Sequence, residues 1–347
     1  MKTPGTDTGP PYYSRMPDAS EHETVPWQGQ SLDEPFSGDL VALVEQIAGI
    51  NAQMPRAIPV AIWARCGEKS DPAELTDRMQ SYELVKSNVM RGTVHLLTLR
   101  QYWLWRTALD PTLRRLVAGF CRGIWDAVDY ETLRTYGLDL MSDGRPRTRA
   151  ELGSEASKHF AEAEARHLGF ALRMILPIVE LAPENAWRPG PTTYRLAPAL
   201  ELPDGEDGLR DLARSFATAF GPASVDDFVY WSGLKKSEAR TVADCLEPAG
   251  TTQDPEKTQL HVLPEFDNLY YCRRSTAGDL YEAKRDPRFN PQRMPGSLLQ
   301  GGRVVGHWTY RKDALPTLSP WQPLDPKAEA KWARFVEWWT RCETSDA

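Results

Sequence analysis

Hydrophobic side chains recur at helical spacing on both sides of a short polar stretch near the N-terminus. They repeat every three or four residues from Leu40 to Ile47 and again from Ile58 to Trp63. This pattern predicts a helix over about 39–49 and a second helix ending near Arg65. The two helices are joined by the polar residues 49–56.

The next stretch of the chain predicts a third helix followed by a hairpin. Asp71 and Pro72 supply an N-cap and a favourable first helical residue for a helix to about Gln80. Two β-prone runs, 82–90 and 93–99, then flank a short turn that contains glycine. Three helices followed by a hairpin is the order of a winged helix, in which the third helix can enter a DNA groove.

The same order of elements recurs twice more, after one helix from Thr98 and another from Asp110 to Trp125. The weak second copy has a short helix from Arg149, a longer one over about 161–181, and a hairpin that pairs residues around 187 with 194–196. The clearer third copy has helices over 207–220, 225–232 and 235–246 and strands over 258–264 and 268–273. The sequence therefore predicts an α+β fold, mainly helical, of tandem winged-helix modules.

These units give the predicted domain boundaries. Residues 1–30 are polar and lack apolar periodicity, so we expect a disordered tail. The first winged helix and the helices after it occupy 31–125, and the second occupies 126–205. The third winged helix occupies 206–347. This region also holds a C-terminal hairpin that turns at Gly301 and Gly302, and a tryptophan-rich helix over 326–342 that we expect to pack on the rest of the protein.

Composition narrows the class of protein. The chain has 347 residues, 41% hydrophobic and 26% charged, as is ordinary for a soluble globular protein. It has no membrane-length apolar run and no signal-peptide pattern, so we expect a cytoplasmic monomer without membrane contact. The five cysteines and six histidines are scattered, and no nucleotide or metal motif occurs. We therefore expect no cofactor and no metal.

Basic residues are concentrated in two segments, although the net charge is -7. Segment 86–122 carries seven bases and one acid, and segment 273–311 carries eight bases and three acids. Segregated charge of this kind can give an anionic polymer a landing surface on an acidic protein. The alternative is that these residues lie on ordinary solvated helix faces.

Four polar side chains are candidates for chemistry, and each has a structural alternative. The amides of Asn51 and Gln53 can hold a water or a base edge without titrating, or they can satisfy backbone groups in a capped turn. Asp267 in the stretch LPEFDN can act as a general base or cap a turn. His95 in RGTVH can act as a base or hydrogen-bond within its hairpin.

Several segments together resemble a family of winged-helix proteins that contains the AlkZ-like and YcaQ-like bacterial DNA glycosylases. The resemblance covers about 37–342, favours the AlkZ-like subgroup, and rests on residues 49–65, 90–98, 221–234, 263–268 and 301–308. It implies a concave, basic surface that binds double-stranded DNA. It also implies base excision repair of alkylated purines, including bulky N7 or N3 adducts and crosslinks made by genotoxic natural products, often as antibiotic self-resistance.

The family's catalytic motif is a glutamine, an aliphatic residue, and a glutamine or aspartate, and it falls on residues 51–53. Gln53 matches the AlkZ-like form, whereas Asn51 departs from the usual first glutamine and shortens the reach by one methylene. The resemblance thus implies that Gln53 and Asn51 are catalytic. The residues expected to contact DNA are Arg56, Arg91, His95, Asp267, Arg273 and Arg274. The alternative is a non-catalytic winged-helix regulator or lesion-binding shield with the same surface.

Overall fold

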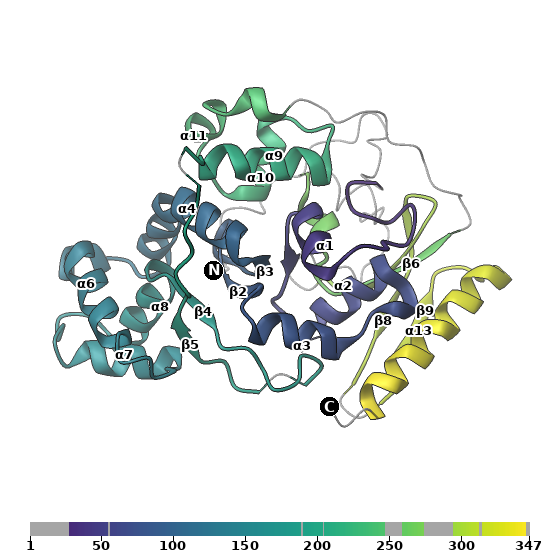
Figure 1. Cartoon of the computed structure of the whole chain (residues 1–347), viewed down its shortest axis with the longest axis horizontal. Coiled ribbons are helices and arrows are strands. Elements are labelled where there is room, and N and C mark those ends of the chain that lie inside the picture. Colours follow the sequence, from purple (N-terminus) through teal and green to yellow (C-terminus); the bar gives the residue numbers. More distant parts are fainter. Residues whose placement is uncertain are drawn as a thin grey trace, which may run out of the picture.

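The computed structural model describes residues 28–344 except 55, 189, 204, 247–258, 274–293 and 312–313. Most of the predicted disordered tail, residues 1–27, therefore lies outside the described residues. Gln30, which falls within the predicted tail, is fully buried, so the folded part begins before position 31. The described chain forms an α+β fold with two small antiparallel sheets, as predicted (Figure 1).

The N-terminal elements follow the predicted order, with one additional strand. They are α1 (Leu40–Gln46), β1 (Ile50–Asn51), α2 (Ala57–Cys66), α3 (Pro72–Gln80), β2 (Leu84–Asn88) and β3 (Val94–Thr98). Asp39 and Asp71 cap α1 and α3 by accepting from Val41 and Ala73 backbone N–H groups. Between α1 and α2, the polar joint contains the short strand β1, which the sequence pattern did not predict.

A single long helix replaces the two helices predicted after residue 98. α4 (Leu99–Phe120) continues through Pro111, where a break was expected. Leu109 packs into one core cluster, and Leu113 and Val117 pack into the next. Burial of these side chains on one continuous helix outweighs the roughly 3 kcal/mol that an interior proline costs. The predicted break was therefore wrong, and α4 links two cores.

The second unit differs most from its prediction. It comprises α5 (Ile124–Ala127), α6 (Tyr130–Met141), α7 (Arg149–Ser157), α8 (Ala165–Ile175), β4 (Ile178–Glu180) and β5 (Tyr194–Leu196). Helix α6 was not predicted. Helix α8 ends earlier than expected because Pro177 disfavours helical geometry at the preceding residue. Strand β5 pairs with β4 and not with residues around Trp187, which packs against the C-terminal helix.

The C-terminal part holds the second sheet. Its elements are α9 (Gly208–Phe220), α10 (Val225–Ser232), α11 (Lys236–Arg240), the 3-10 turn η4 (Ala243–Leu246), β6 (Leu260–Leu263), the 3-10 turn η5 (Asn268–Tyr271), β7 (Gly296–Gln300), β8 (Arg303–Thr309) and β9 (Thr317–Pro320). The strand predicted over 268–273 was wrong, because Asp267 caps η5 there instead. The predicted helix over 235–246 is divided into α11 and η4.

Both sheets and the terminal helix surround buried apolar clusters. The first sheet has the order β1-β3-β2-β4-β5, so it joins strands of the first and second predicted units, and the second has the order β6-β7-β8-β9. Helix α13 (Pro326–Thr344) lies beside the second sheet (Figure 1). Its Trp338 and Trp339 are buried against Trp63 of α2 and against Trp187. Within the described residues, no helix is long and apolar enough to cross a membrane, and no metal-binding cluster occurs.

Candidate functional site

The predicted catalytic pair lies where the chain leaves the edge of the first sheet. Strand β1 pairs antiparallel with β3, with Ile50 opposite Leu96 and Asn51 opposite His95. The next backbone N–H, from Ala52, donates to the Val94 carbonyl (2.9 Å). The pairing buries Asn51, which is 2% exposed, and the chain then turns outward so that Gln53 is exposed. One of the two amides is therefore internal and the other faces solvent.

The two side-chain amides are bonded to each other in a fixed orientation. The Gln53 backbone N–H donates to Asn51 Oδ1 (3.1 Å), which identifies the oxygen of the Asn51 amide. Asn51 Nδ2 then donates to Gln53 Oε1 (3.1 Å), so the Gln53 amide nitrogen is directed away from Asn51. This leaves Gln53 with two N–H donors and one oxygen lone pair for an external group. Asn51 thus caps a turn, as the structural alternative predicted, and among the described residues the Gln53 amide nitrogen has no hydrogen-bond partner.

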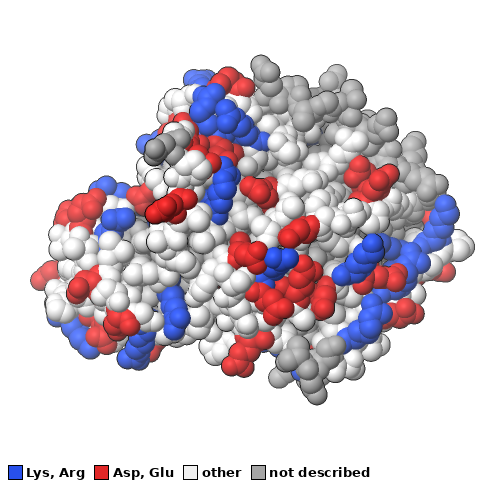
Figure 2. All heavy atoms as spheres, viewed as in Figure 1, with Lys and Arg blue, Asp and Glu red and all other residues white. Residues whose placement is uncertain are grey.

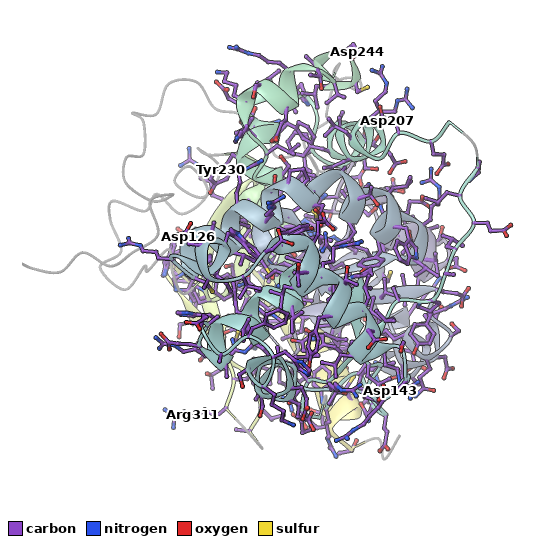
Figure 3. The ribbon with its side chains drawn as sticks, turned by 90° about the vertical axis from the view of Figure 1, so that its left-hand side faces the viewer. Asp126, Asp143, Asp207, Tyr230, Asp244 and Arg311 are labelled. Carbon is purple, nitrogen blue, oxygen red and sulfur yellow. The ribbon has the colours of Figure 1, made fainter. Side chains whose placement is uncertain are left out.

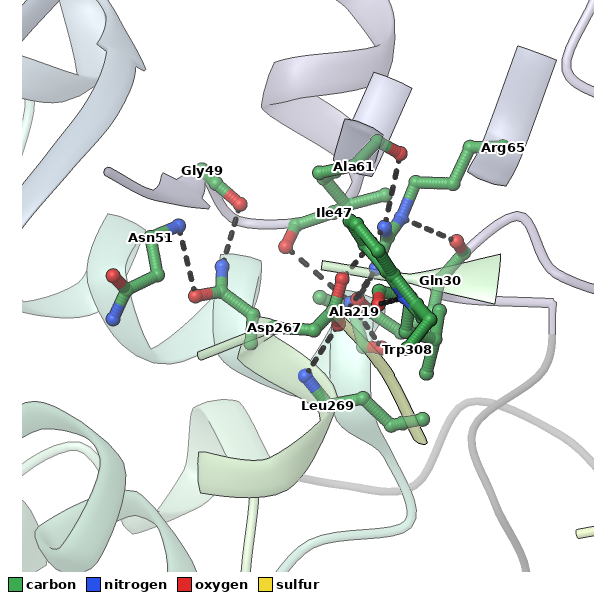
Figure 4. Close-up of polar contacts among 12 residues, drawn as sticks. Gln30, Ile47, Gly49, Asn51, Ala61, Arg65, Ala219, Asp267, Leu269 and Trp308 are labelled. Carbon is green, nitrogen blue, oxygen red and sulfur yellow. Dashed lines mark hydrogen bonds and ion pairs between the residues drawn. The ribbon is translucent and has the colours of Figure 1, made fainter. Parts of the chain in front are cut away.

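Asn268 holds the other side of β1. Its Oδ1 accepts from the Asn51 backbone N–H (3.1 Å), and its Nδ2 donates to the Gly49 carbonyl (2.6 Å) (Figure 4). Asn268 is itself 4% exposed. The sequence did not single out this residue, because nothing in the pattern placed LPEFDN next to residues 49–51. The available signals were its position beside Asp267 and its place in the segment 263–268, which carries part of the resemblance.

Asp267 forms a buried ion pair, which corrects its predicted role in contacting DNA. It accepts two hydrogen bonds from Arg65, at 3.0 and 3.1 Å, and one from the Leu269 backbone N–H (3.0 Å) (Figure 4). Arg65 also donates to Gln30 and to the Ala61 carbonyl. Both charged side chains are 1% exposed. Asp267 therefore fixes η5 against α2, as the turn-capping alternative predicted.

His95 is also internal, so its predicted contact with DNA is corrected. The ring is fully buried, and Nδ1 lies 3.0 Å from the Thr93 carbonyl oxygen within the hairpin. Burial, with a further contribution from the Arg91 charge, lowers the pKa of His95 to about 3. Since a carbonyl can only accept, Nδ1 carries the proton of the neutral ring. This matches the structural alternative, a histidine bonded within its own hairpin.

Arg91 and Arg56 are held by aromatic side chains. Arg91 has a φ of 53°, donates to the Trp231 carbonyl, and lies 5.1 Å from the centre of the Tyr271 ring. The Arg56 guanidinium lies within 4.6 to 5.2 Å of three ring centres, those of Trp187, Tyr310 and Trp339. It also pairs with Glu343 at 2.6 Å. Arg56 thus anchors α13, and its predicted contact with DNA stays a prediction.

The predicted contact at Arg273 is corrected as well. Its side chain is 4% exposed and donates to the carbonyl oxygens of Phe220 (3.3 Å) and Pro222 (2.6 Å). It therefore ties the segment after η5 to the end of α9. Arg274, predicted beside it, lies outside the described residues, as does most of the basic segment 273–311.

Within the described residues, four of the seven bases in segment 86–122 form ion pairs, three of them with acids from other parts of the chain. Its ion pairs are Lys86 with Glu180 (2.7 Å), Arg100 with Glu206 (2.7 Å), Arg106 with Asp110 (3.0 Å) and Arg115 with Glu238 (3.0 Å). Outside this segment, Arg147 pairs with Asp143 and Arg210 pairs with Asp244. Asp143 lies near the bottom and Asp244 at the top of the view in Figure 3. The sequence therefore overstated the local positive charge, although Arg114 and Arg122 remain exposed.

Helix α3, the expected groove-binding helix, has an acidic surface. Its only base, Arg78, is paired with Asp39, Glu74 and Glu83. Acidic side chains gather around this helix on the face shown in Figure 2. The hairpin β2–β3 is also not a free wing, because β1 and β4 pair with its two outer edges. The sign of the charge argues against insertion of α3 into a DNA groove.

Comparison with known proteins identifies the family to which this chain belongs. The profile of a family described as DNA glycosylase AlkZ-like matches residues 44–341, so the chain belongs to the AlkZ-like DNA glycosylase family. The resemblance given by the sequence segments is thereby confirmed.

A solved structure with a similar fold is that of the Streptomyces sahachiroi DNA glycosylase AlkZ. The two chains are 17% identical and superpose with a TM-score of 0.65 over 90% of this chain and 95% of that one. A search of curated protein sequences found no match. At this identity the likeness shows a shared fold, and the site must be argued from its own residues.

Proposed function

We propose that this protein is a monofunctional DNA glycosylase that excises alkylated purines. Its membership of the AlkZ-like DNA glycosylase family supports this function, and the Streptomyces protein with a similar fold is named as a DNA glycosylase. The observation that carries the proposal is the exposed amide of Gln53, held in one orientation by the buried Asn51. In this assignment Gln53 contacts the attacking water, and Asn51 acts through Gln53.

A neutral amide is sufficient for this reaction if the base is already a good leaving group. Alkylation at N7 or N3 makes a purine cationic. When its glycosidic bond breaks, the bonding electron pair moves into the ring and neutralises that charge. The oxygen of a water molecule then bonds to the anomeric carbon of the sugar, and its proton passes to solvent. Gln53 Oε1 has one lone pair left to orient this water, which is the positioning contribution that the reaction requires.

We also infer that the N-terminal unit is a winged helix used as a scaffold. Its order of α1, β1, α2, α3, β2 and β3, with β1 beside β3, supports this assignment. The acidic surface of α3 argues that DNA approaches along the side that carries Gln53 and not along α3. Large N7 or N3 adducts of a genotoxic natural product remain the proposed substrate class.

The test is single-turnover release of base from a duplex that contains an N7-alkylguanine. Gln53→Ala should slow release by about a hundredfold, while the affinity for DNA and the melting temperature change little. The matched control is Gln80→Ala, which removes an exposed amide on α3, away from the motif. It should leave the release rate unchanged. Stoichiometric retention of the lesion without release by the wild-type protein would refute the enzyme and support a lesion-binding shield.

A further inference from the structure

Strand β1 is short and lies at the edge of its sheet. It consists of Ile50 and Asn51, and in the sheet order only β3 lies beside it. Its other edge presents the Gly49 carbonyl and the Asn51 N–H. A two-residue edge strand with such groups unpaired would fray easily. Its position therefore depends on what binds that edge.

The Asn268 side chain binds this edge as a neighbouring peptide group would. Its amide oxygen accepts from the Asn51 N–H, and its amide nitrogen donates to the Gly49 carbonyl, at 3.1 and 2.6 Å. The two backbone partners have fixed roles, so the orientation of the Asn268 amide is determined. Asn268 thus closes the second edge of β1 with one donor and one acceptor.

Asn268 is itself held in place by a rigid support. It begins the 3-10 turn η5, which Asp267 caps through the Leu269 N–H. The buried Arg65 fixes the Asp267 carboxylate from α2, at 3.0 and 3.1 Å. Arg65 is hydrogen-bonded to Asp267, and the next residue in the chain, Asn268, is hydrogen-bonded to Asn51, which lies 217 positions away in the sequence (Figure 4).

This support determines where Gln53 can place its amide. Gln53 is exposed, so packing does not fix its side chain. Within the part of the chain that the structure describes, its side chain makes one hydrogen bond, from Asn51 Nδ2. A shift of the Asn51 backbone would therefore move the Gln53 amide with it.

We propose that Asn268 is a positioning residue for base excision, which sets the location of Gln53 by fixing both backbone partners of β1. This inference rests on the proposed glycosylase function. Asn268 touches no reacting atom in this assignment. Since a displacement of about 1 Å can cost on the order of a hundredfold in rate, loss of the clamp should slow excision without weakening DNA binding.

The first experiment compares Asn268→Ala with a control that loses a buried hydrogen bond elsewhere in the same sheet. Ser87→Ala is suitable, because the buried Ser87 hydroxyl donates to the Ile178 carbonyl (2.7 Å) and does not contact β1. Both variants should have lower melting temperatures. Only Asn268→Ala should lose about a hundredfold in the single-turnover rate at saturating DNA, with the dissociation constant within about twofold of wild type.

A second variant separates positioning from general damage by its pH dependence. Asn268→Asp keeps an oxygen that accepts from the Asn51 N–H. When the new carboxylate is ionised, its second oxygen faces the Gly49 carbonyl oxygen, and the two repel each other. Protonation would restore a donor at that place. The rate of this variant relative to wild type should therefore be low near pH 7.5 and recover toward pH 5.5. A ratio that stays constant across this range would overturn the proposed geometry.

A third measurement does not depend on activity. Hydrogen exchange of the peptide that spans residues 49–53 should be faster in Asn268→Ala than in Ser87→Ala, since the Asn51 N–H loses its acceptor. Unchanged exchange, or normal excision by a folded Asn268→Ala protein while Gln53→Ala is impaired, would overturn the role of Asn268 and leave the glycosylase function intact. If wild type releases no base, the glycosylase function and the positioning role both fail, while exchange still reports whether the clamp exists.

Discussion

The buried pair of Arg65 and Asp267 gives the sharpest test of whether Asp267 is structural or catalytic. Asp267→Asn removes the negative charge but keeps a similar shape and an oxygen that can cap the Leu269 N–H. In the structure, Asp267 is the sole carboxylate that the described residues place on the Arg65 guanidinium. The substitution therefore leaves a buried positive charge without compensation.

The size of the effect follows from burial and geometry. Both side chains are 1% exposed, and the two bonds of 3.0 and 3.1 Å form a bidentate pair. Removing one partner of such a buried pair costs about 3–5 kcal/mol. For a chain of this size, that corresponds to a fall in melting temperature on the order of 8 °C. The other partners of Arg65 are the neutral Gln30 and Ala61, which cannot replace the lost charge.

The assay is a thermal and a urea melt of each variant beside its single-turnover excision rate at a temperature where it is folded. Asp244→Asn is the control, because its carboxylate is 60% exposed and pairs with Arg210 at the surface. Its melting temperature should change little, because solvent screens a surface ion pair. Replacing both members of the buried pair, with Arg65→Met and Asp267→Leu, should recover much of the stability.

One result would refute this reasoning. If Asp267→Asn melts like wild type but loses as much excision as Gln53→Ala, the carboxylate is a general base and the ion pair is incidental.

Two further predictions concern the interior. Burial lowers the pKa of both His95 and His261 to about 3, so the folded state keeps them neutral while the unfolded chain protonates them near pH 6.5. The free energy of unfolding should not depend on these two protonations above pH 6.5. It should fall by about 1.4 kcal/mol per pH unit for each histidine as the pH drops toward 3. His95→Gln should reduce this slope in melts across pH 4–7. Trp339→Ala should lower the free energy of unfolding by about 3–5 kcal/mol in a urea melt, because the ring is fully buried. The control Glu337→Ala, on the exposed face of α13, should lower it little. Equal stabilities of the two variants would show that α13 is not docked in solution.

The sequence pattern predicted correctly those helices and turns that are determined by neighbouring residues. The capped start of α3 at Asp71 and the hairpin at Gly301 and Gly302 need only neighbouring residues to form, and both occur where expected. Pro111 shows the opposite case, because the two cores that hold α4 together are built by distant segments. Helix α6 escaped prediction because its buried side includes Gly137, a small residue that leaves room for Leu172 and gives no apolar signal.

The candidate site shows the same division between local and distant information. The order of residues 51–53 was enough to select Gln53 and Asn51. Asn268 could not be found in this way, because its contact with β1 depends on the folding of η5 against α2. Charge was misleading for a related reason. The bases of segment 86–122 are visible in sequence, but partners such as Glu180 and Glu238 join them only in the folded chain.

The burial of Asn51 restricts the chemistry that this site can support. A carboxylate there could still accept from the Gln53 N–H but would lose the donor that orients Gln53 Oε1, and its charge would be buried at a position that is 2% exposed. His95, which lies opposite Asn51 on β3, is held neutral because burial lowers its pKa to about 3. Under the proposed function, the site would therefore orient a water through uncharged groups and would not remove its proton. Under the proposed function, discrimination between damaged and normal bases must then come from the leaving group, since a cationic purine departs without the acid or base that an ordinary base would need.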